Sequence, residues 1–173
     1  RMRRIICAAI AKNWARWRGP SGQGLVTGTG YPDSWSGTEN VKWKVPVPGS
    51  GNSSPIVWGD RIFMTTAYDN GRRLSIVAFR RTDGVKVWET FAPEGRTPYG
   101  NHYKNGFASA TPATDGQRIY ASFGPRGLLA VDMNGKQVWF RDLGAMDAYH
   151  GTAGSPLLYK NRLILYQDQW RNS

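Results

Sequence analysis

A tryptophan hairpin that occurs twice limits the possible fold of this chain more than any other feature. Residues 77–91 (VAFRRTDGVKVWETF) and 128–144 (LLAVDMNGKQVWFRDLG) both alternate apolar and polar residues, turn at a glycine and reach a tryptophan four residues later. Alternation with a period of two predicts a strand, and Asn-Gly or Asp-Gly tolerates the positive φ angles of primed hairpin turns. Each stretch is therefore predicted to form two antiparallel strands.

The segments upstream of these hairpins repeat as well. Each contains a small residue, Ser or Thr, a proline, an apolar run, a turn and a second apolar run; the three copies are 53–67, 109–123 and 153–167. Their prolines, Pro55, Pro112 and Pro156, are separated by 57 and 44 residues. A period of about 40 to 50 residues with four short strands per unit is typical of β-propeller blades.

Counting strands predicts an all-β fold, a partial β-propeller of about two and a half four-stranded antiparallel blades. The blades are expected at about 53–92, at about 109–144 and, incomplete, at 153–173, with an extra strand around 41–47. A closed ring needs about four blades. The chain is therefore expected to be a fragment whose exposed sheet faces contact the remaining blades or a protein partner, or cause self-association.

Three tryptophans occupy equivalent places in the repeat and are predicted to pack between neighbouring blades: Trp43, Trp88 and Trp139. Other tryptophans, among them Trp14 and Trp17, precede the first blade and have Arg16 and Arg18 nearby. Such a set can stack on single-stranded nucleic acid. Packing of an N-terminal segment across the propeller explains the same residues and is favoured, with Trp17 partly exposed.

The first sixteen residues form a basic, signal-like segment, and the predicted propeller domain follows at 17–173. The segment begins RMRRIICAAIA, in a chain with a net charge of +11. Its apolar run only reaches the lower length of an export signal and is too short to span a bilayer. A basic arm could also bind nucleic acid or anionic lipid, although no specific nucleic acid is predicted. Cys7 is the only cysteine, so neither a disulfide framework nor a cysteine-based metal site is expected within the chain.

From Trp17 onward the chain resembles the pyrrolo-quinoline quinone (PQQ) repeat proteins, a β-propeller superfamily. The residues that carry this resemblance are WRGP (17–20), ENVKWKVPVPGSGNSSP (39–55) and LLAVDMNGKQVW (128–139). Asp132 fits the blade consensus, whereas Arg80 replaces the corresponding aspartate of the first blade. The chain is most similar to exported bacterial propeller proteins, which implies a periplasmic or secreted location.

Two functions remain open. The preferred hypothesis is a noncatalytic propeller scaffold for protein interaction or ligand binding, without a cofactor. The alternative is a fragment of a PQQ-dependent quinoprotein dehydrogenase that oxidises alcohols, for which the resemblance implies PQQ with calcium, a catalytic aspartate and often a cysteine pair. The chain has one cysteine and 12 scattered acidic residues. No catalytic residue and no metal ligand are therefore predicted.

The candidate ligand-binding residues lie in the two connections between blades. They are His102, Tyr103 and Lys104 in the first connection, and Tyr149 and His150 in the second. Propeller geometry places such connections on one face, and loops on a rigid scaffold commonly carry binding residues. The five residues are therefore predicted to form a polar ligand patch. The competing interpretation is that they are ordinary loop residues bonded to neighbouring backbone.

Overall fold

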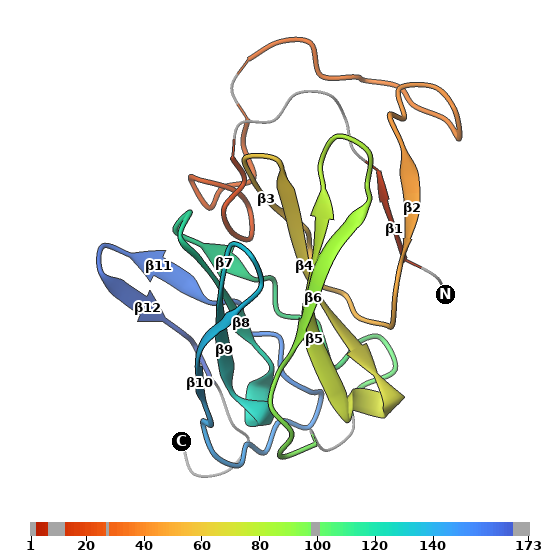
Figure 1. Ribbon diagram of the computed structural model, residues 1–173. Helices are drawn as coiled ribbons and strands as arrows, with labels where there is room; N and C mark the ends of the chain where they lie inside the picture. The colour runs from red at the N-terminus through yellow and green to blue at the C-terminus, as the bar shows by residue number, and fades with distance from the viewer. Residues whose placement is uncertain (1–2, 7–12, 27, 98–100, 168–173) are drawn as a thin grey trace.

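The computed structural model is an all-β protein, which confirms the predicted fold class (Figure 1). It describes residues 3–6, 13–26, 28–97 and 101–167. Two four-stranded antiparallel sheets form its centre, flanked by a two-stranded sheet on one side and a hairpin on the other. In these residues the only helices are two single 3-10 turns, η1 (Asp69–Gly71) and η2 (Gly124–Arg126). No helix in the described part is long and apolar enough to cross a membrane.

The first sheet is buried on both faces. Along its second and third strands, alternate side chains such as Phe63 and Ile76 enter the core shared with the second sheet, whereas Ile62 and Val77 enter a core on the opposite face. This alternation follows from the period of two in a strand. The strands are β3 (Ile56–Trp58), β4 (Arg61–Tyr68), β5 (Arg73–Arg80) and β6 (Lys86–Phe91).

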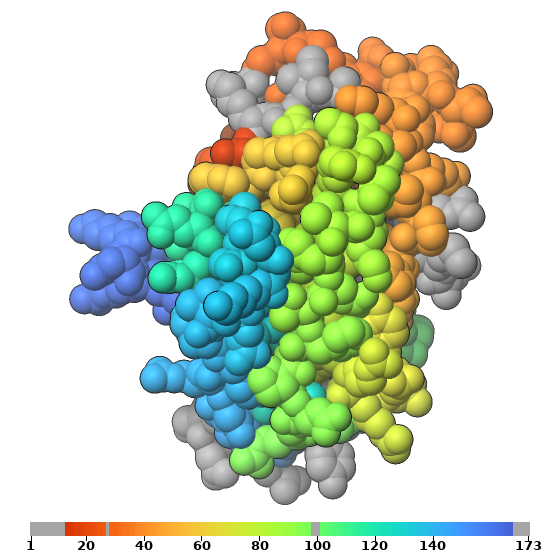
Figure 2. All heavy atoms as spheres, in the orientation of Figure 1, coloured from red at the N-terminus to blue at the C-terminus, as the bar shows by residue number. Residues whose placement is uncertain are grey.

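The second sheet repeats the same up-and-down order of strands, and one of its faces packs on the first sheet. Its strands, in chain and spatial order, are β7 (Ala113–Thr114), β8 (Arg118–Ser122), β9 (Leu128–Asp132) and β10 (Gln137–Arg141). A third unit contributes the hairpin of β11 (Leu157–Tyr159) and β12 (Arg162–Ile164). Figure 2 shows this hairpin projecting from the side of the second sheet. The strands thus lie within the predicted blade ranges.

On the opposite side, β2 (Lys44–Val47) pairs antiparallel with β1 (Arg3–Ile6). The β1 residues were predicted to belong to a signal-like segment; in the structure they form a strand. The rest of the apolar run, including Cys7, lies outside the described residues. Val47 of β2 is buried in the second core of the first sheet, the one that contains Ile62 and Val77.

The N-terminal segment packs across β3 and β7, the first strand of each four-stranded sheet. Trp14 exchanges two backbone hydrogen bonds with Val57 of β3, with N···O distances of 2.7 and 2.9 Å. The Thr114 N–H of β7 donates to the Ala15 carbonyl at 2.9 Å. Trp17 is 51% exposed, and the Arg18 guanidinium lies 4.6 Å from the centre of its ring. The Trp14 contacts agree with the packing interpretation of the N-terminal tryptophans, whereas Trp35, also predicted to pack, is 66% exposed in the N-terminal loop.

The hairpin turns differ from the primed turns that the sequence suggested. Gly135 has a φ of +86° and Gly84 a φ of +76°, but neither Asn134 nor Asp83 has a positive φ. The Asp132 N–H instead bonds to the Lys136 carbonyl across a longer loop. A type I turn followed by one left-handed glycine explains this geometry, which occurs in hairpins with longer loops.

Two of the three repeated tryptophans contact the glycine turn of the neighbouring sheet. The Trp43 Nε1–H donates to the Arg81 carbonyl at 2.8 Å, and its ring covers Gly84. The Trp88 Nε1–H donates to the Met133 carbonyl at 3.1 Å, and its ring covers Gly135.

Trp139 has different surroundings, although it is half-buried like Trp88. Its ring lies 6.0 Å from that of Tyr120, and it lines a groove of about 480 Å³ together with Leu163 of β12. The rings of Trp43 and Trp88 cover a glycine turn of the next sheet. Within the described residues, the third unit has no equivalent turn for the Trp139 ring to cover.

Candidate functional site

Both blade-to-blade connections lie at one end of the sheets, next to η1 and η2 (Figure 1). These are residues 92–112, between β6 and β7, and residues 142–156, between β10 and β11. The turns that contact Trp43 and Trp88 join the strands at the opposite end. We call the end formed by the two connections the loop face.

A buried arginine fastens the first connection to both sheets. Arg126, the last residue of η2, is 3% exposed. Its guanidinium donates to the carbonyls of Arg96 at 2.7 Å, Arg72 at 2.9 Å and Pro93 at 3.0 Å. Burial lowers the pKa of Arg126, an effect that Glu94 partly offsets. The charged group is therefore held by carbonyl dipoles, and no ion pair to it is formed by the described residues.

The two histidines meet where the connections touch. Their ring centroids are 5.3 Å apart at an interplanar angle of 79°. The His150 carbonyl accepts the Asn105 side-chain N–H at 2.7 Å and the His102 backbone N–H at 3.4 Å. The Asn105 side chain also bonds to Ser109, just before β7. Hydrogen bonds across the loops thus fix the position of the histidine pair.

Two tyrosines extend the histidine pair into a row of four rings. Tyr103 lies 4.4 Å from His102, and Tyr149 lies 4.9 Å from His150, measured between ring centroids. We call Tyr103, His102, His150 and Tyr149 the aromatic row. Tyr103 is 83% exposed and Tyr149 is 75% exposed. The Lys104 ammonium lies 5.5 Å from the Tyr103 ring. The structure therefore brings all five candidate residues together, and ligand binding by them stays a prediction.

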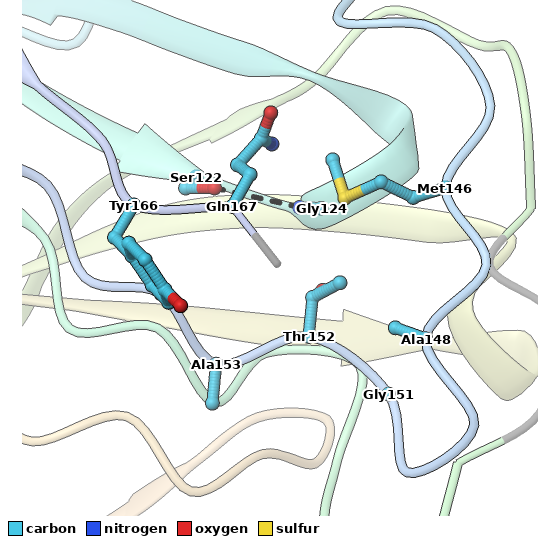
Figure 3. A pocket seen from close by; sticks show the side chains of 10 residues that line it. Ser122, Gly124, Met146, Ala148, Gly151, Thr152, Ala153, Tyr166 and Gln167 are labelled. Carbon is cyan, nitrogen blue, oxygen red and sulfur yellow. Dashed lines mark hydrogen bonds between the residues drawn. The ribbon is translucent and has the colours of Figure 1, made fainter. Parts of the chain in front are cut away.

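A cavity of about 190 Å³ is lined in part by the second connection (Figure 3). Ala148 and Gly151, which flank Tyr149 and His150, form part of its wall. Gly124 has a φ of +59°, and a Cβ there would lie 2.0 Å from Thr152 Oγ1, so only glycine permits this close approach. The remaining residues of the wall are Ser122, Met146, Thr152, Ala153, Gly154, Tyr166 and Gln167.

Sequence reasoning missed the residues that build this site. Arg126 stands in a Gly-Pro-Arg-Gly turn between two apolar runs, and a lone basic residue there gives a weak signal. Asn105, Ser122 and Thr152 are polar residues of common types with no distinguishing spacing. Only the fold brings Asn105 to the His150 carbonyl and Ser122 and Thr152 to one cavity.

The described residues show no carboxylate cluster for the calcium ion that the family resemblance suggests, and the absence of a cofactor stays a prediction. Calcium is held by six to eight oxygen atoms, several of them from carboxylates. No three His, Cys, Asp or Glu side chains within the described ranges converge on a common point. They supply no ligand set for the ion, and we derive no chemical step through the quinone.

Comparison with known proteins identifies a matching family and a solved structure with a similar fold. The family model described as outer membrane protein assembly factor BamB matches residues 21–167. Curated proteins give no significant match. Among solved structures, the crystal structure of BamB from Moraxella catarrhalis is similar, with a TM-score of 0.54 and 19% sequence identity. The similar region covers 74% of this chain and 38% of that one, and at this identity it shows the fold alone.

Proposed function

The chain belongs to the PQQ-repeat propeller family described as outer membrane protein assembly factor BamB, and from this membership we propose that it is a noncatalytic scaffold of the cell envelope that binds another protein through its loop face. The aromatic row, with Lys104 beside it, is the proposed contact surface. The family description, which names an assembly factor, supports both protein binding and the envelope location.

The single observation that carries the proposal is the exposed aromatic row. Tyrosine is enriched at the centres of protein interfaces, where it supplies a large contact area at a low cost in conformational entropy. Tyr103 and Tyr149 are both mostly exposed, and cross-loop hydrogen bonds to the His150 carbonyl join the backbone of the two connections between them. A surface that is ordered before binding loses less entropy when the partner docks.

The proposal is tested with the double variant Tyr103→Ala/Tyr149→Ala, expressed in the protein's own cells. Loss of two central tyrosines should weaken partner binding at least about tenfold, which corresponds to about 1.4 kcal/mol. The measurement is the amount of each envelope protein that copurifies with the variant.

The matched control is Tyr159→Ala. Tyr159 lies on β11, away from the row, and is 58% exposed. Like Tyr103, it has a lysine near its ring. The control should keep its partners. Unchanged copurification with a correctly folded double variant would refute the proposal.

A further inference from the structure

The cavity beside the aromatic row continues the proposed binding surface into the protein. A segment that crosses Tyr149 and His150 passes directly over Ala148 and Gly151, which form the cavity wall. An apolar cavity of about 150 Å³ can hold a benzene molecule, so a volume near 190 Å³ is enough for one side chain. The cavity is therefore placed and sized to receive a residue of the bound segment.

The polar groups of the cavity wall are the hydroxyls of Ser122, Thr152 and Tyr166 and the side-chain amide of Gln167. Ser122 is only 5% exposed, and its Oγ accepts the Gly124 N–H at 3.5 Å, which leaves the hydroxyl hydrogen to be donated. Among the described residues, no acceptor bonds to the hydroxyl of Ser122 or of Thr152. A buried donor without an acceptor costs free energy, so such groups are normally satisfied by a ligand or water. The buried Ser122 hydroxyl therefore calls for an acceptor inside the cavity, and the half-buried Thr152 hydroxyl lines the same cavity (Figure 3).

A buried cation in the same turn as a cavity residue, together with the net charge of the chain, favours an anionic acceptor over a neutral one. Arg126 belongs to the same 3-10 turn as Gly124, which lines the cavity. Its buried guanidinium is bonded to three carbonyls and forms no ion pair within the described residues. Its positive charge acts in surroundings of low dielectric constant, where charge interactions are strong, and is partly balanced by Glu94. The chain as a whole carries a net charge of +11, which also favours an acidic partner.

We propose that the cavity receives the carboxylate of a glutamate or aspartate side chain, carried by an extended segment of the partner protein that lies across the aromatic row. This inference rests on the proposed function and names the partner's chemistry. The Ser122 and Thr152 hydroxyls donate to the carboxylate oxygens, and the charge of Arg126, in the same turn as Gly124, stabilises the anion at longer range.

The test uses blocked pentapeptides of alanine with one central residue, glutamate or glutamine, titrated into the ¹⁵N-labelled protein. The glutamate peptide should shift the amide signals of Gly124, Gly151 and Thr152 in a saturable way. The glutamine peptide should bind about tenfold more weakly, because charge-assisted hydrogen bonds are roughly twice as strong as neutral ones. Equal binding of both peptides would overturn the inference.

Variants show whether the hydroxyls are responsible. Thr152→Val keeps the side-chain shape and should weaken glutamate-peptide binding several-fold, as should Ser122→Ala. Ser34→Ala removes an exposed hydroxyl far from the cavity and should change nothing. Unchanged binding by the folded Thr152→Val variant would overturn the inference. So would tighter binding of an alanine peptide whose only carboxylate is a free C-terminus.

The two tests fail separately. If the glutamate peptide does not bind while the tyrosine variants lose their partner, the cavity inference is wrong and the proposed function stands. If the tyrosine variants keep their partner, the proposed function is wrong whatever the peptides do.

Discussion

Replacing Gly135 with alanine should weaken the packing of the first two sheets on each other. Gly135 lies under the Trp88 ring, and a Cβ added there would be 2.6 Å from Trp88 Cδ2. The glycine also has a φ of +86°, which a residue with a side chain adopts only with strain. Gly135→Ala therefore combines backbone strain with a collision against the tryptophan.

The two costs can be separated with Gly144, which has a φ of +84° and no atom within 4 Å of an added Cβ. Backbone strain alone predicts that Gly144→Ala lowers the free energy of unfolding by about 1 to 2 kcal/mol. Displacing the Trp88 ring adds about 1 to 3 kcal/mol at Gly135, the usual cost of overpacking. Gly135→Ala should thus cost about 2 to 5 kcal/mol in total.

Urea denaturation of both variants, alone and combined with Trp88→Ala, measures these terms. When the indole is absent, the extra cost at Gly135 should disappear and the two alanine substitutions should become equally costly. The explanation is refuted if Gly135→Ala is no more destabilising than Gly144→Ala, or if its extra cost is unchanged in the Trp88→Ala background.

Three further predictions concern stability and the loop face. Burial alone would raise the pKa of Glu89, but hydrogen bonds from Tyr68, Ser75 and Lys86 lower it overall, so its stabilising effect is present above the ordinary glutamate pKa. Acid titration of unfolding should show this stability lost as pH falls through the lowered pKa, and Glu89→Gln should flatten that loss; an unchanged profile would contradict it. Arg126→Met leaves three carbonyls without their donor and should lower the free energy of unfolding by about 2 to 4 kcal/mol. It should also speed proteolysis in residues 93–97, and cleavage at the wild-type rate would contradict this prediction. Asn105→Ala removes a bond to the His150 carbonyl and should speed amide exchange around the histidines, which NMR would detect; unchanged exchange would show that the bond does not fix the row.

The repeated strands could be predicted from the sequence because their signals are local. Alternation of apolar residues, a turn glycine and a tryptophan at a fixed distance specify each hairpin, and the structure has these hairpins at the expected places. The turn type was wrong because the difference between a primed turn and a longer loop depends on the φ angle of Asn134, which Asn-Gly alone does not determine. Pairing of β1 with β2 joins segments about 40 residues apart, so no local pattern indicates it.

The candidate site was predictable only in part. Both histidines could be assigned to one face, since propeller geometry places the connections between successive blades at the same end of the sheets. The contacts that fix them depend on Asn105 and Arg126, whose partners lie up to 54 residues away in sequence. The cavity is formed by three separate segments that include Ser122, Thr152 and Tyr166, and no spacing in the sequence brings these together.

Site-specific photo-crosslinking in the protein's own cells most directly tests the claim that the loop face binds a protein. Benzoylphenylalanine would be placed at position 103, 149 or 35; Trp35 is 66% exposed in the N-terminal loop, away from the row. We predict that positions 103 and 149 crosslink to the same partner protein and that position 35 does not. If neither row position forms a protein adduct, or if position 35 captures the same partner equally well, the claim is contradicted.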